Sequence, residues 1–138
     1  MFDANEVING LYGFVYDENG KQMQETKAFE AIVDYDKEEV LQAGKLMKGH
    51  KVIAASGAGT ITAHKIDSRL QRKAADNPHA KYNFSAKLKD PTSKGEEYIM
   101  FIGVSFDSAQ LMSFELGELG EIEMDFTFDD YKYLKSIS

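Results

Sequence analysis

The residue types that most often carry catalysis or bind metals are sparse in this sequence. There are three histidines, His50, His64 and His79, and no cysteine. No two histidines have the helical i, i+4 spacing of a metalloprotease or the short spacing of a zinc finger. Without cysteine there is no thiolate nucleophile, disulfide or thiolate zinc site. We therefore expect solvated or locally hydrogen-bonded histidines and no catalytic residue, metal site or cofactor.

Ser56 and the Gly-Ala-Gly that follows it match neither a catalytic serine motif nor a phosphate-binding loop. Ser56 lacks the glycine two positions earlier that a nucleophile elbow requires. The Gly-Ala-Gly that follows it is too short to cradle a phosphate and leads into a strand-like run, not into a helix. These glycines instead predict a turn or bulge between two extended pieces, residues 52–55 and 60–66.

Carboxylates gather in the last third of the chain, at Glu115, Glu118, Glu121, Glu123 and Asp125. They do not follow the alternating Asp and Asn register that a calcium loop closes with Glu. A glycosidase pair would need a desolvated pocket, and no motif supports an acid–base hydrolase. We predict that Glu121, Glu123 and Asp125 form a solvated acidic face of a strand.

Hydrophobic alternation predicts the strands that would position these groups. It is clearest over residues 121–128, where apolar and acidic side chains take opposite faces of the strand. The Asn-Gly at residues 19–20 predicts a tight hairpin turn, and a Pro and a Gly within residues 89–95 predict a longer one. Further strands are expected at residues 11–18, 21–25, 28–35, 81–88 and 97–106.

One short helix is predicted over residues 67–75. Asp67 or Ser68 can cap its amino end, Leu70 and Ala74 share one face, and an Asn-Pro pair follows its last turn. Together with the strands, this helix predicts a mainly β fold, a small antiparallel β-barrel or sandwich with one flanking α-helix.

Length and composition indicate a single folded domain over residues 1–138. The chain is 43% hydrophobic and contains seven Tyr and nine Phe, enough for one aromatic-rich core. Its formal charge of −7 argues against tight binding to a nucleic-acid backbone. Neither a signal peptide nor an apolar run of about 18 residues or more is present, so we expect no export and no membrane insertion.

Charge is unevenly distributed along the chain. Residues 95–131 contain no Lys or Arg, whereas Lys45, Lys48 and Lys51 cluster in the middle of the sequence. Two patches of opposite sign suit a head-to-tail contact between copies, which closes into a ring if the rotation permits. The alternative is that the basic stretch is a solvated loop.

Four phrases resemble the tail tube proteins of contractile phage tails, of the PBSX prophage type and of tail-like bacteriocins. The resemblance covers residues 7–131. The phrases are Gly44-Lys45-Leu46-Met47-Lys48-Gly49-His50-Lys51, Gly57-Ala58-Gly59-Thr60, Val104-Ser105-Phe106-Asp107-Ser108-Ala109 and Phe126-Thr127-Phe128-Asp129-Asp130.

The resemblance implies a structural subunit without enzymatic residues. It implies six-membered rings that stack into a hollow tube, with an extended assembly arm at about residues 44–57. The expected assembly residues are those from Gly44 to Lys51 together with Gly57 and Gly59. The implied partners are further copies of the chain and the sheath, baseplate and tail terminator proteins. DNA, or ions in a headless bacteriocin, would pass without specific binding. Assembly is expected in the bacterial cytoplasm, before the protein becomes part of a tail or a released particle.

The residues add two expectations to this resemblance. Apolar Leu46 and Met47 stand among lysines and glycines, so the arm gains most by lying across a neighbour. The acidic face at residues 121–125 would repel DNA if it lines the channel. The alternative is a monomeric β-barrel that binds an apolar ligand, as aromatic-rich barrels can.

Overall fold

The computed structural model describes residues 4–7, 13–23, 26–66, 68–89, 91 and 95–136. Seven described strands form one antiparallel sheet in the order β1-β4-β5-β6-β3-β2, with β7 paired to β5. The elements are a 3-10 turn Ala4–Glu6, β1 Gly13–Tyr16, β2 Thr26–Val40, β3 Gly49–His64, α1 Arg69–Asp76, β4 Tyr82–Leu88, β5 Glu97–Phe106, β6 Glu121–Phe128 and β7 Asp130–Lys135. The mainly β fold with one helix is therefore confirmed.

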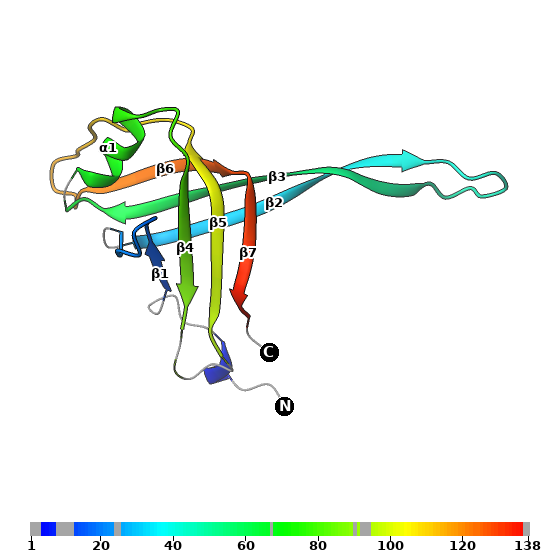
Figure 1. Ribbon diagram of the computed structural model, residues 1–138, viewed down its shortest axis with the longest axis horizontal. Coiled ribbons are helices and arrows are strands. Elements are labelled where there is room, and N and C mark those ends of the chain that lie inside the picture. The colour runs from blue at the N-terminus through cyan, green and yellow to red at the C-terminus, as the bar shows by residue number, and fades with distance from the viewer. Residues whose placement is uncertain are drawn as a thin grey trace.

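The sheet folds over on itself at β5, because this strand changes partner along its length. Its first half pairs with β7, while Ser105 and Phe106 pair with β6. Gly103 lies between the two pairings with a φ of +70°, a left-handed conformation that favours glycine. As a result β4, β5 and β7 run across β2, β3 and β6 (Figure 1), in a sandwich-like arrangement that the described strands do not close into a barrel.

An aromatic core fills the space between the crossing strands. Along β6, exposed and buried residues alternate without exception, as predicted, and the buried set is Ile122, Met124, Phe126 and Phe128. The ring of Phe101 on β5 lies 5.1 Å from that of Phe128, and Phe29 on β2 lies 5.7 Å from Phe126. Aromatic pairs at such distances add to the stability gained from burial.

The predicted turn at residues 56–59 was wrong, because β3 runs unbroken through Gly57 and Gly59. A Cβ on Gly57 would lie 2.3 Å from the ring of Phe128, and one on Gly59 would lie 2.5 Å from the ring of Phe126. The glycines therefore let the aromatic rings of β6 lie against the backbone of β3, a close approach that any larger residue would block.

The predicted helix is confirmed as α1, with Leu70 and Ala74 buried. Ser68 stands at its N-cap position but makes no side-chain capping hydrogen bond there, and Asp67 lies outside the described residues. Gln71 on the same helix is also buried, which was not predicted, and its amide donates to the carbonyl oxygen of Gln110 at 2.9 Å. This contact ties α1 to the segment between β5 and β6.

The turn at residues 17–21 is also confirmed. Gly20 has a φ of +77°, and the Asp17 carboxylate accepts hydrogen bonds from the backbone N–H groups of Asn19 and Lys21, both at 2.9 Å. The predicted return strand over residues 21–25 is reduced to a bridge between Tyr16 and Gln22, and residues 24–25 lie outside the described part of the chain.

Candidate functional site

The most conspicuous feature is a β-hairpin that projects far beyond the body (Figure 1). Strands β2 and β3 pair from Thr26 with Ala63 to Val40 with Gly49, and all residues from 34 to 56 are exposed. We call residues 34–56 the arm. The predicted segment 44–57 supplies its end loop and one of its strands, whereas the β2 half of the arm was missed. The β2 half was missed because the hydrophobic alternation ends at residue 35, whereas the strand continues to Val40.

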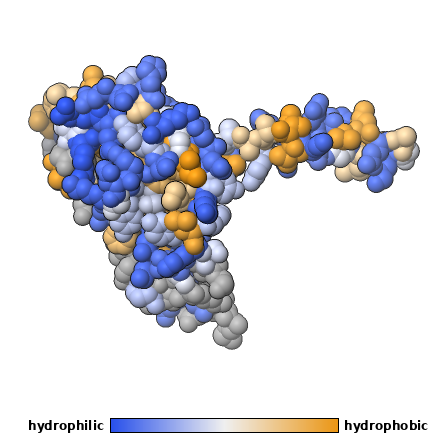
Figure 2. All heavy atoms as spheres, in the orientation of Figure 1, coloured by the Kyte–Doolittle hydropathy of each residue, from blue (hydrophilic) through white to orange (hydrophobic). Residues whose placement is uncertain are grey.

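Large apolar side chains are exposed along the arm. At its tip Leu46 is 100% and Met47 82% exposed, and Leu41, Val52 and Ile53 are each at least half exposed. Figure 2 shows this as orange patches along the projecting arm. A two-stranded ribbon cannot bury these groups against itself, and exposed apolar surface of this kind marks a protein interaction site.

The arm as a whole is not basic, which corrects the predicted patch of positive charge. Lys51 lies opposite Glu38 in the register of the hairpin, and the ammonium of Lys48 lies 3.1 Å from the carboxylate of Glu39. Residues 34–56 contain four acidic residues and four lysines, so these charges cancel. Only the end loop, residues 41–48, keeps two lysines and no acid.

The structure exposes the predicted acidic residues on one face of the sheet. Glu121, Glu123 and Asp125 alternate with the buried residues of β6. The hydroxyl of Thr60 on β3 donates to the Asp125 carboxylate at 2.7 Å, and Glu121 forms an ion pair with Lys27. The hydrogen bond from Lys27, followed by its charge, lowers the pKa of Glu121, so this carboxylate is ionised at neutral pH.

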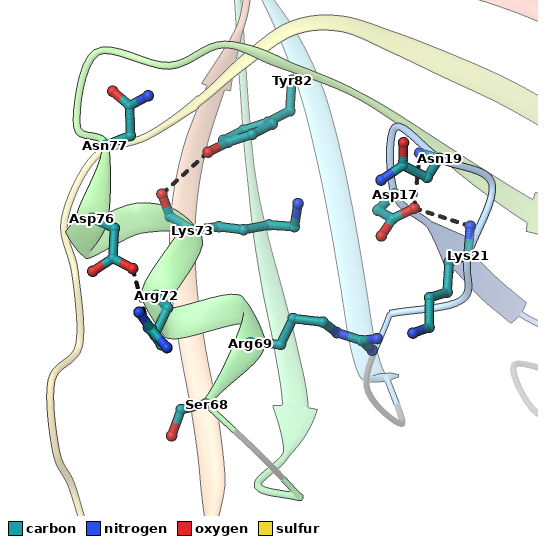
Figure 3. Close-up of a pocket in the computed structure, with 10 residues that line it drawn as sticks. All are labelled: Asp17, Asn19, Lys21, Ser68, Arg69, Arg72, Lys73, Asp76, Asn77 and Tyr82. Carbon is teal, nitrogen blue, oxygen red and sulfur yellow. Dashed lines mark hydrogen bonds and ion pairs between the residues drawn. The ribbon is translucent and has the colours of Figure 1, made fainter.

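An open pocket lies between α1 and the turn at residues 17–21 (Figure 3). It is rich in charge, but its charged groups bind one another. Lys73 pairs with Glu18 at 2.5 Å and lies over the ring of Tyr82, and Arg72 pairs with Asp76 at 3.1 Å. The contacts of Lys73 fix α1 against the body, whereas the Arg72–Asp76 pair lies within the helix, and none of these contacts joins a nucleophile to its base.

The described residues form neither a metal site nor a membrane-spanning helix. They contain no group of three or more His, Asp or Glu side chains placed to hold a metal ion. Within the same part of the chain, no helix has the length and apolar character needed to span a membrane. His50 and His64 lie on β3, and His79 follows α1, so the three histidines belong to different regions of the structure.

The segment between β5 and β6, residues 107–120, was not predicted to have any role. Its large apolar side chains are more than three-quarters exposed: Leu111 76%, Met112 79%, Phe114 80%, Leu116 94% and Leu119 85%. Their spacing fits both a strand, at Met112, Phe114 and Leu116, and a helix, at Met112, Leu116 and Leu119, so periodicity did not assign the segment to either. The signal that could have identified this segment was the large number of apolar residues in a stretch with no predicted helix or strand.

Comparisons with known proteins agree with this architecture. The family model described as phage tail tube protein matches residues 1–135. The phage-like element PBSX protein XkdM of Bacillus subtilis is 34% identical over 143 aligned residues, which cover 98% of this chain and 95% of that protein.

Solved structures show the same fold at low sequence identity. A chain from the sheath-tube complex of an extracellular contractile injection system has a TM-score of 0.72 at 10% identity, over 99% of this chain and all of that one. A chain from the tube terminating cap of the anti-feeding prophage has a TM-score of 0.76 at 9% identity, over 99% and 96%. With the family model spanning nearly the whole sequence, this chain belongs to the phage tail tube protein family.

Proposed function

We propose that this chain is the subunit of the inner tube of a contractile, phage-like tail, in which six-membered rings stack into a hollow conduit. The observation that carries the proposal is the arm: a long hairpin with exposed apolar side chains that the body of the same molecule does not cover. Such an arm gains stability only when it lies on another molecule. Membership of the tail tube family supplies the kind of assembly.

The contractile character is supported by the fold neighbours. These neighbours come from a sheath-tube complex of a contractile injection system and from the tube terminating cap of an anti-feeding prophage. By analogy, the partners of this chain are further copies of itself together with sheath, baseplate and terminator proteins. Assembly would take place in the bacterial cytoplasm before the tail is complete.

The role proposed is structural and not enzymatic. The acidic face of β6 suits the wall of a channel, because Glu121, Glu123 and Asp125 would repel the phosphates of passing DNA. The same face would let ions pass in a headless particle. A closed ring would also cover exposed sheet edges, which are otherwise sites of uncontrolled association.

Most of the arm can be removed by closing the hairpin at a paired position. Lys37 and Val52 are partners across the two strands, so residues 38–51 can be replaced by Asn-Gly, a turn that suits two-residue hairpins. We expect the natural chain to form large particles in sedimentation velocity as its concentration rises, and the shortened chain to stay small.

Two outcomes would count against the proposal. A natural chain that remains monomeric at millimolar concentration would contradict a self-assembling tube. A shortened chain that assembles like the natural one would show that the arm is not the joint between subunits.

A further inference from the structure

The exposed segment between β5 and β6 is held firmly at both ends. We call residues 107–120 the apolar loop. At its start the N–H of Asp107 donates to the carbonyl of Asp125 at 2.9 Å, and the side chain of Gln110 accepts from the N–H of Glu123 at 3.2 Å. At its end the carbonyl of Gly120 accepts from the N–H of Lys65 at 2.7 Å.

Between these anchors the apolar loop is uncovered. Phe114, Leu116 and Leu119 are 80%, 94% and 85% exposed, although the ends of the loop are fixed to the body. A fixed segment that exposes several large apolar side chains to solvent is typical of a protein interaction site. Monomeric proteins seldom expose such a patch without function.

The tip of the arm has the matching chemistry. It exposes Leu41, Leu46 and Met47 and carries Lys45 and Lys48. The apolar loop carries Asp107, Glu115 and Glu118 and no basic residue. Lys48 already pairs with Glu39 of the same arm, so apolar groups would meet apolar groups and Lys45 would meet carboxylates, in a contact that charge complementarity orients.

Geometry requires this contact to form between two molecules. The apolar loop lies with α1 at the end of the body farthest from the arm tip (Figure 1). No molecule can place its own tip on its own loop. We propose that the apolar loop is the socket for the arm tip of a second copy of this chain, which makes the contact head-to-tail and repeatable from subunit to subunit. This inference rests on the proposed tube function and names the surface that the arm meets.

The absence of cysteine from the sequence makes a cross-linking test simple. Met47→Cys places a thiol on the arm tip and Met112→Cys places one on the apolar loop, both at exposed positions. With a flexible bismaleimide, we expect the double variant to give a ladder of covalent multimers. A mixture of the two single variants should stop at dimers, and neither single variant alone should cross-link.

A control pair and electron microscopy separate the possible failures. Met47→Cys with Lys132→Cys on exposed β7 should give no ladder. If tubes form but the thiol of Met47→Cys cross-links to that of Lys132→Cys, to another copy of itself, or to nothing, the socket is wrong and the tube function stands. If neither particles nor cross-links appear at millimolar concentration, the tube function fails and the socket with it.

A charge exchange tests the same contact without a cross-linker. Lys45→Glu should raise the concentration needed for assembly by about two- to fivefold, the size expected for one exposed charge pair. Adding Glu118→Lys should restore assembly if the two surfaces meet. Leu116→Ser, at a position that is 94% exposed in the single chain, should weaken assembly and leave the melting temperature of the monomer unchanged. Unaltered assembly in both Lys45→Glu and Leu116→Ser would overturn the proposal.

Discussion

Two glycines in β3 allow the aromatic rings of β6 to lie against its backbone. At Gly57 an added Cβ would come within 2.3 Å of the ring of Phe128, far inside ordinary contact distance. We expect Gly57→Ala to lower the free energy of unfolding by about 1–3 kcal/mol, the usual cost of overpacking a core. Chemical denaturation of the monomer measures this change.

Controls for this substitution lie in the same strand and in the ring itself. Ala58 is exposed between the two glycines, so Ala58→Ser should change stability by less than about 0.5 kcal/mol. In a Phe128→Leu background, Gly57→Ala should cost less, because the smaller side chain vacates the space. An equal cost in both backgrounds would mean that the ring does not require the glycine.

Glu96 is a charged residue whose effect on stability depends on pH. Its side chain is only 15% exposed and lies 3.3 Å from Lys87, 3.5 Å from Lys135 and 3.7 Å from Lys89. Desolvation raises its pKa, but the hydrogen bond from Lys87 and the charges of the lysines outweigh it. The pKa of Glu96 is therefore lowered from its usual 4.5.

A carboxylate with a lowered pKa stabilises the fold above its unfolded pKa and loses this effect as the pH falls through its folded value. Glu96→Gln should therefore lower the melting temperature at pH 7, and the gap to the natural chain should close below pH 4.5. Exposed Glu115→Gln serves as the control and should show no such gap. A gap that persists unchanged at low pH would show that the ionised form of Glu96 is not what stabilises the fold.

At the scale of elements, the body contains the hydrophobic core and the arm lies outside it. All residues from 34 to 56 are exposed, so the arm contributes little to the packing of the core. We expect the chain shortened between Lys37 and Val52 to keep the melting temperature of the monomer within about two degrees, the shift that ~0.5 kcal/mol produces in a domain of this size. A larger loss of thermal stability would mean that the arm supports the body.

Sequence patterns predicted those helices and strands that can be recognised from the residues of one segment alone. Strand β6 follows from alternation, β5 from a run of apolar and aromatic residues, and the buried face of α1 from helical spacing, each within its own segment. The continuity of β3 could not be predicted, because its glycines are explained by rings from β6, more than sixty positions away in the chain. Strand β7 was missed since all six of its residues are exposed and carry no core pattern.

Candidate assembly surfaces were predictable only in part, for a related reason. Leu46 and Met47 among lysines and glycines indicated the arm, but its length depends on pairing with residues 34–40, whose acidic side chains cancel the predicted basic charge. The spacing of apolar residues in the apolar loop fits a strand and a helix equally well, and only the fold shows that its side chains are uncovered.

Across the whole molecule, the arm, the apolar loop and the acidic face of β6 lie at different places, so each can make a different contact in an assembly. The arm leaves the body at one end and the apolar loop lies at the other (Figure 1), while the acidic residues occupy the exposed face of the sheet formed by β2, β3 and β6. A ring of such subunits can present its acidic faces to a common channel and still have arms and loops available for contacts between subunits.

Cryo-electron microscopy of the concentrated, purified protein tests the tube assignment most directly. We predict rings or stacked tubes with six-fold symmetry and a width of about 80–100 Å, the size of six small domains arranged around a channel. The map should place Glu121, Glu123 and Asp125 of every subunit toward the central channel. A protein that stays monomeric at millimolar concentration, or a ring whose channel is lined by another face, would contradict this account.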